Sequence, residues 1–202
     1  MNISITEYLF KVHKRDPAPS ISVLDSPSVT PAEAGGERGD DGGKKVNGRT
    51  RQCWVDTHGF LLRVLVHPAD ISDTEGAEWL LAAYHQSFPR MQEIRVDEGY
   101  KQGLNEWMQQ NTTIRLNSIE KLPGQTGCAV IPKRWLAERA ITWARRHRLA
   151  RNADNRTPES SEAFLYLSSI ALLLNRRYPR CSFLIMLSER HGHHHDTTNP
   201  VF

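Results

Sequence analysis

Cysteine is scarce in this sequence. The chain has three cysteines in 202 residues, Cys53, Cys128 and Cys181, and no two of them have the CxxC spacing of a zinc ribbon. An odd number of widely separated cysteines argues against a disulfide framework and indicates a reducing compartment. We therefore expect scattered core thiols.

Long apolar runs are also absent. The amino terminus lacks the basic head and long apolar stretch of a signal peptide. The longest apolar run elsewhere, residues 164–174, is interrupted by two serines and is too short to span a bilayer. The sequence thus predicts a soluble, cytoplasmic protein with no membrane partner.

A strong excess of charge of one sign is missing as well. The net charge of +3 permits a polyanionic partner without requiring one. Hydrophobic residues make up 39% and charged residues 24%, which is a globular balance. The length suits one domain with a real core, and the mean hydropathy of −0.54 indicates that some segments are not packed.

The order of the predicted elements is mixed α/β. Residues 31–51 hold six glycines among mixed charges, which predicts a flexible basic loop. The other predicted elements are a strand ending at Asp25, a hairpin around residues 57–59, a helix over 74–88, a strand before Asp97, a helix over 102–111, a strand over 112–120, and helices over 133–151 and 158–177. Thr157 is the expected N-cap of the last helix, with Pro158 as its first residue.

Glu138 is the one acidic residue among seven Lys and Arg residues between positions 133 and 151. At 100° per residue, Glu138 and Arg145 both fall within about 40° of Arg134 on the predicted helix. Two interpretations stay open. Glu138 forms an i,i+4 ion pair with Arg134 on a solvated face, or it holds a metal ion while the cations bind phosphates.

Three carboxylates have the chemistry of a phosphodiester-cleaving site. Such cleavage uses two divalent ions about 4 Å apart, and Mg²⁺ prefers oxygen ligands. Asp25 and Asp97 each lie where a predicted strand ends, and Glu138 projects from a helix. These carboxylates form a metal site if the two strands are adjacent.

Several motifs resemble those of DDE transposases of bacterial insertion sequences, in the IS-five branch of the IS-four-like group. They are DSPSV, RGDDGGKKVNGRTR, WVDTHGFLL, VDEGY and RWLAER, and the resemblance covers about residues 16 to 176. The family helix carries Tyr-x2-Arg-x3-Glu-x6-Lys, and the matching positions are Ile131, Arg134, Glu138 and Arg145. Glu98 and Asp40 depart from the family pattern.

The resemblance implies a ribonuclease H-like fold over residues 21–177 and DNA cleavage at transposon ends, followed by strand transfer into target DNA. Asp25, Asp97 and Glu138 would be the catalytic residues and would bind two Mg²⁺ ions, for which Mn²⁺ could substitute. The residues that would contact DNA phosphates are Lys44, Lys45, Arg49, Arg51, Arg134 and Arg145.

The two ends of the chain depart from the family. Residues 1–20 read as a remnant of the amino-terminal region that helps to recognise transposon ends, and residues 178–202, with HGHHH, as a disordered tail. We therefore expect weak end-specific DNA binding in a gel shift, which nanomolar binding would contradict. The expected protein partners are a second copy of the chain or a companion amino-terminal transposase product.

Two other functions are compatible with the sequence. One is a catalytically inactive, truncated transposase that only binds DNA or a partner subunit. The other is a ribonuclease H-like nuclease with no role in transposition. Metal-dependent nicking separates the first from an active enzyme, and terminal inverted repeats flanking the gene separate the second.

Overall fold

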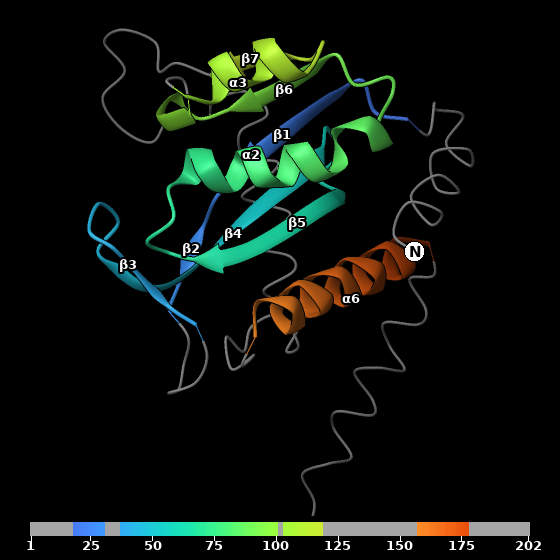
Figure 1. Ribbon diagram of the computed structural model, residues 1–202. Helices are drawn as coiled ribbons and strands as arrows, with labels where there is room; N and C mark the ends of the chain where they lie inside the picture. Colours follow the sequence, from blue (N-terminus) through green and yellow to red (C-terminus); the bar gives the residue numbers. More distant parts are fainter. Residues whose placement is uncertain (1–17, 31–36, 101–102, 119–156, 178–202) are drawn as a thin grey trace, which may run out of the picture.

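The computed structural model describes residues 18–30, 37–100, 103–118 and 157–177 (Figure 1). A mixed sheet forms its centre, with the strand order β5-β4-β1-β6-β7. β4 is antiparallel to both of its neighbours, whereas β1, β6 and β7 are parallel to one another. The five strands are β1 (Ile21–Asp25), β4 (Val46–Asp56), β5 (Leu61–Pro68), β6 (Glu93–Val96) and β7 (Arg115–Ser118).

Two short strands extend the sheet near the carboxyl end of β1. β2 (Ser28–Val29) continues along β4 after Pro27, and β3 (Gly39–Asp41) forms a hairpin with the start of β4. These additions give β4 partners along nearly its whole length.

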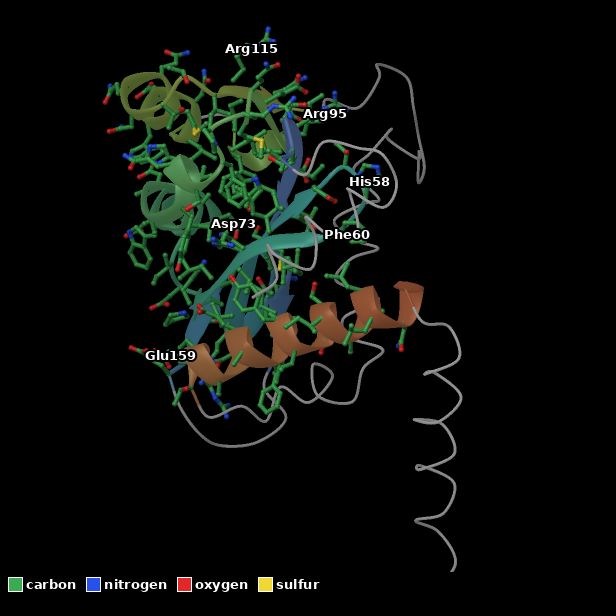
Figure 2. All side chains as sticks on the ribbon, turned by 90° about the vertical axis from the view of Figure 1, so that its right-hand side faces the viewer. His58, Phe60, Asp73, Arg95, Arg115 and Glu159 are labelled. Atoms are coloured by element: carbon green, nitrogen blue, oxygen red, sulfur yellow. The ribbon has the colours of Figure 1, made fainter. Side chains whose placement is uncertain are left out.

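Helices cover both faces of the sheet. α2 (Asp73–Tyr84) and α3 (Leu104–Asn111) lie on one face, together with the short 3-10 helices η1 (His85–Ser87) and η2 (Glu98–Tyr100). α6 (Pro158–Arg177) runs along the opposite face, with Glu159 at its start (Figure 2). None of the helices in the described ranges is both long and apolar enough to cross a membrane.

Alternation along β4 divides its side chains between the two faces. Trp54 belongs to the main core with Leu80, Ile94 and Met108, and none of these four exposes more than 1% of its surface. Cys53 faces the other way and packs with Leu165 of α6. Both faces of β4 are buried from Gly48 to Asp56, so its buried polar side chains, Gln52 among them, need partners inside the protein.

Most predicted elements are confirmed. The strand ending at Asp25, the hairpin, the helix that starts near residue 74, the strand before Asp97 and the elements up to residue 118 are all present. The last helix starts at Pro158 as predicted, and Thr157 Oγ1 accepts a hydrogen bond from the Ser160 amide at 3.2 Å. The predicted helix over 133–151 lies outside the described residues.

The expectation of a loop throughout residues 31–51 is wrong for residues 39–41 and 46–51, which form β3 and the start of β4. The glycine content suggested a flexible loop, but Gly48 allows two strands to pack closely. A Cβ atom at Gly48 would clash with the carbonyl oxygen of Val29, so glycine lets β4 approach β2.

Candidate functional site

Asp25 and Asp97 lie at the same edge of the sheet. β1 and β6 are parallel neighbours, and Val23 is paired with Arg95. Asp25 and Asp97 lie two residues beyond the members of this pair. Asp25 is the last residue of β1, and Asp97 directly follows β6. Adjacent strands are about 4.8 Å apart, so the condition that the sequence left open, adjacency of the two strands, is met.

Each aspartate is oriented by the amide that follows it. Asp25 Oδ1 accepts from the Ser26 amide at 3.0 Å, and Asp97 Oδ1 accepts from the Glu98 amide at 2.8 Å. Each carboxylate is thus held by the backbone of the turn that follows it.

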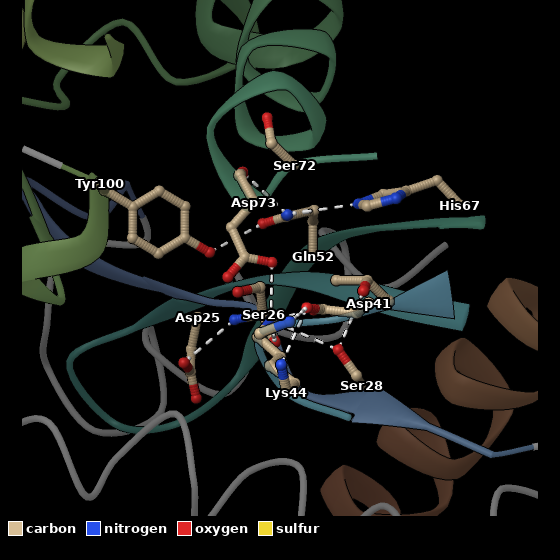
Figure 3. Close-up of polar contacts among 12 residues, drawn as sticks. Asp25, Ser26, Ser28, Asp41, Lys44, Gln52, His67, Ser72, Asp73 and Tyr100 are labelled. Carbon is tan, nitrogen blue, oxygen red and sulfur yellow. Dashed lines mark hydrogen bonds and ion pairs between the residues drawn. The ribbon is translucent and has the colours of Figure 1, made fainter. Parts of the chain in front are cut away.

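Gln52 is a buried polar residue in the middle of β4, on the face that α2 covers. Its Oε1 accepts from the Tyr100 hydroxyl at 3.1 Å, and its Nε2 donates to the backbone carbonyl of Asp73 at 3.0 Å (Figure 3). Burial raises the pKa of Tyr100 well above its usual value, so the hydroxyl stays protonated and acts as the donor.

His67 completes the surroundings of the Gln52 amide. His67 Nδ1 lies 2.7 Å from the Pro68 carbonyl, so Nδ1 carries the proton and Nε2 accepts from Gln52 Nε2 at 3.3 Å. Burial lowers the pKa of His67, which favours this neutral form. The amide group of Gln52 is therefore held in one orientation.

The first turn of α2 packs directly on this group. Ser72 is the N-cap and accepts from the Glu75 amide at 3.2 Å. A Cβ atom at Gly76 would clash with the His67 ring, so glycine is needed for the helix to approach β4 and β5 this closely. This close approach places Asp73, the first residue of α2, within reach of Lys44.

Lys44 comes from the turn between β3 and β4 and reaches Asp73. Its ammonium nitrogen lies 2.7 Å from Asp73 Oδ1, 3.1 Å from the Ser26 carbonyl and 3.3 Å from Ser28 Oγ (Figure 3). Asp41 shapes the turn, because its Oδ1 accepts from the amides of Gly43 and Lys44 at 3.0 and 2.9 Å. Lys44 thus contacts the backbone of Ser26, the residue that follows Asp25.

The structure separates the other predicted phosphate-binding residues. Lys45 is exposed and has a positive φ of 54°. Arg49 and Arg51 are buried, with 3% and 2% of their surface exposed, and Arg49 Nε donates to the Glu37 carbonyl at 2.8 Å. Neither arginine is exposed for direct contact with a phosphate. Arg134 and Arg145 lie outside the described residues.

The two aspartates fit a hard divalent cation by the chemistry of their donors, which are carboxylate oxygens from neighbouring strand ends. Within the described ranges, no group of three or more His, Cys, Asp or Glu residues could hold a metal ion. The third predicted ligand, Glu138, falls outside these ranges.

Sequence reasoning missed Gln52, His67, Asp73 and Tyr100 as parts of this region. One signal was available, because Gln52 is a polar residue beside the apolar CWV segment of a predicted strand. A buried polar residue needs partners. The sequence does not show which residues supply them.

Comparison with known proteins bears on the family of the chain. A model of the transposase DDE domain family matches residues 16–174. No curated protein sequence matches the chain.

Solved structures of integrases are also similar. The catalytic core domain of BIV integrase has 15% identity and a TM-score of 0.45, over 76% of this chain and 82% of that one. A chain of the simian T-cell lymphotropic virus intasome, in complex with PP2A regulatory subunit B56 gamma, has 15% identity and a TM-score of 0.48, over 74% of this chain and 48% of that one.

The strand order, with three antiparallel strands followed by two parallel ones and helices on both faces, agrees with the ribonuclease H-like α/β fold that the resemblance predicts. The family model spans most of the chain and includes both aspartates. The chain therefore belongs to the transposase DDE domain family.

Proposed function

We propose that this chain is the catalytic part of an insertion-sequence transposase of the IS-five branch, which cleaves DNA at transposon ends and joins the freed ends to target DNA. The observation that carries this proposal is the placement of Asp25 and Asp97 at the same edge of two neighbouring parallel strands. Membership of the DDE family supports the type of chemistry.

Asp25, Asp97 and Glu138 would hold two Mg²⁺ ions, and Mn²⁺ would substitute for them. When bound, such ions activate a water molecule and stabilise negative charge on the phosphate oxygens. Asp25 and Asp97 contribute ligands whose directions are set by the amides of Ser26 and Glu98.

DNA is the proposed partner, both as transposon ends and as target. Lys45 is exposed on the turn next to this edge, where a cation can approach a phosphate. Arg134 and Arg145 are proposed to contribute from the segment that carries Glu138. A second copy of the chain or a companion amino-terminal product would pair the two ends.

A second candidate function is that of an inactive transposase that binds DNA or a partner subunit. Glu98 favours this alternative, because it adds a carboxylate directly after Asp97. The Glu98 side chain is exposed, however, and its amide supports the Asp97 carboxylate. Both features are compatible with an active site.

The first prediction concerns DNA nicking. In the presence of Mg²⁺ or Mn²⁺, the purified chain should nick a supercoiled plasmid that carries the ends of its element. Asp97→Asn should reduce the initial rate by more than about a hundredfold, because loss of a direct ligand exceeds the 10–100-fold effect of indirect ones. Agarose gel electrophoresis of the plasmid forms measures the rate.

Asp40→Asn is the matched control, since Asp40 is an exposed aspartate on β3 and its substitution should leave the rate unchanged. Nicking that is equal in the wild type and Asp97→Asn would exclude the proposed site. DNA binding without nicking by the wild type would favour the inactive alternative. Terminal inverted repeats flanking the gene would exclude a nuclease with no role in transposition.

A further inference from the structure

A continuous series of polar contacts connects the two aspartates through the α2 side of the sheet. From Asp25 it passes through Ser26, Lys44, Asp73, Gln52 and Tyr100 to Asp97. Figure 3 labels the residues from Asp25 to Tyr100. We call this series the Lys44–Tyr100 network.

The first half of the network fixes the peptide after Asp25. The Ser26 amide donates to Asp25 Oδ1, and the Ser26 carbonyl accepts from Lys44 Nζ. Ser26 itself is buried, with 7% of its surface exposed. Because the backbone N–H and carbonyl groups of Ser26 both have defined partners, the strand end that carries Asp25 has little freedom to turn.

The Lys44 side chain is 36% exposed, but its ammonium group has several partners within the protein. An ammonium group has three N–H donors, and three oxygens lie within 3.3 Å of Nζ, those of Asp73, Ser26 and Ser28. Asp41 adds a second carboxylate at 3.8 Å. These partners favour a role for Lys44 within the protein over a phosphate contact.

The second half of the network fixes the turn after Asp97. Tyr100 is 2% exposed, and its amide donates to the Asp97 carbonyl at 3.1 Å. Its hydroxyl donates to Gln52, whose amide also holds the carbonyl of Asp73. The two halves meet at Asp73, where the side chain binds Lys44 and the backbone binds Gln52.

We infer that Lys44 and Tyr100 are positioning residues for the metal-binding aspartates, and that the Lys44–Tyr100 network sets the positions of Asp25 and Asp97 relative to each other. This inference rests on the proposed function. It assigns Lys44 a role within the protein in place of the phosphate contact that its charge suggests. Groups that orient metal ligands typically change metal affinity by about 10–100-fold when they are removed.

The test measures Mn²⁺ binding to the full chain without DNA, from the loss of the free Mn²⁺ signal in electron paramagnetic resonance. Lys44→Met keeps the length of the side chain and removes its charge, whereas Tyr100→Phe removes one hydroxyl group. Each variant should raise the Kd for Mn²⁺ by about tenfold. The double variant should show less than the product of the two effects, because both act through one network.

Two variants control for charge and stability. Lys45→Met removes the neighbouring exposed cation. Tyr166→Phe removes a hydroxyl that accepts a hydrogen bond from the Val64 amide at 3.0 Å on the α6 side of the sheet. Both controls should leave the Kd for Mn²⁺ unchanged. Thermal unfolding followed by circular dichroism checks that each variant is folded. If Lys44→Met does not fold, the Kd of Tyr100→Phe for Mn²⁺ tests the inference.

A DNA-binding series in EDTA separates positioning from phosphate contact. Lys44→Met should keep the wild-type dependence of affinity on salt, whereas loss of a phosphate contact would reduce the slope by about 1. A reduced slope, with Mn²⁺ binding unchanged, would overturn the inference in favour of a phosphate contact.

Asp97→Asn distinguishes failure of the inference from failure of the proposed function. If Asp97→Asn loses Mn²⁺ binding but Lys44→Met and Tyr100→Phe bind Mn²⁺ like the wild type, the inference is wrong and the proposed site stands. If Asp97→Asn binds Mn²⁺ like the wild type, or if the wild type binds none, the proposed site and the inference both fail.

Discussion

Gln52 and Cys53 are neighbours in β4 whose environments differ completely. Gln52 faces α2 and forms hydrogen bonds with residues from three other elements or turns. Cys53 faces α6 in an apolar cluster, and burial raises the pKa of its thiol to about 12. Successive side chains of a strand point to opposite faces, so one position of register decides between a polar network and a core thiol.

The second prediction follows from the burial of Cys53. At pH 8 the native protein should not react with iodoacetamide at this residue, because only the thiolate attacks and its fraction is negligible at a pKa of about 12. In guanidinium chloride the same cysteine should react fully. Peptide mass spectrometry measures both states, and modification of Cys53 at equal rates in the native and unfolded protein would contradict its burial.

α6 covers the outer edge of β5 with two side chains. Tyr166 Oη lies 3.0 Å from the Val64 amide nitrogen, and Glu162 Oε1 lies 2.8 Å from that of Val66. Four helical residues rise about 6 Å and two strand residues about 6.8 Å, so the two spacings match. The amides of Val64 and Val66 are thereby satisfied without another strand.

The third prediction concerns Glu162. Burial raises its pKa, so its contribution to stability is greatest below its usual value of 4.5 and is lost as the pH rises through the folded-state pKa. Glu162→Gln keeps an acceptor for Val66 without the charge. Relative to the wild type, this variant should gain free energy of unfolding between pH 4 and pH 7, by an amount that solvent screening of the half-buried carboxyl keeps small.

Urea unfolding at several pH values measures this difference. Glu162→Ala is the comparison, since it should lose about 1–3 kcal/mol by leaving the Val66 amide without this acceptor. A relative stability of Glu162→Gln that falls as the pH rises would show that the carboxylate, and not its protonated form, is favoured on folding.

At the scale of the whole molecule, topology brings Asp25 and Asp97 together. β2 to β5 and α2 separate them along the chain, yet β1 and β6 are adjacent and parallel. Carboxylates that share a site repel each other, and a bound cation relieves that repulsion. If the proposed metal binds only the folded chain, it would therefore stabilise this edge of the sheet.

The fourth prediction is a metal-dependent rise in Tm. Mn²⁺ at about 100 times its Kd should stabilise the wild type by about 2.7 kcal/mol, which corresponds to several degrees for a protein of this size. Asp25→Asn should abolish this rise without lowering the Tm in metal-free buffer, because it removes one of two like charges.

Differential scanning calorimetry measures both effects, and Asp40→Asn should respond like the wild type. An equal rise in Asp25→Asn would exclude Asp25 as a ligand.

Much of the fold was predictable from local patterns. The apolar residues before Asp25 and Asp97, the hairpin at residues 57–59 and the Thr157-Pro158 helix start are short-range signals, and the structure has the corresponding elements. β3 and the start of β4 were missed, because at Gly48 glycine serves a close approach to β2 that composition cannot reveal.

The sequence by itself determined the family motifs, the α/β class and the position of each aspartate at the end of a strand, because these depend on neighbouring residues. Only the tertiary structure decided that the two strands are adjacent, that Arg49 and Arg51 are buried and that Lys44 binds Asp73 and the Ser26 carbonyl. These contacts join residues far apart in the chain, and their partners are selected by strand pairing and helix packing, which local sequence does not specify.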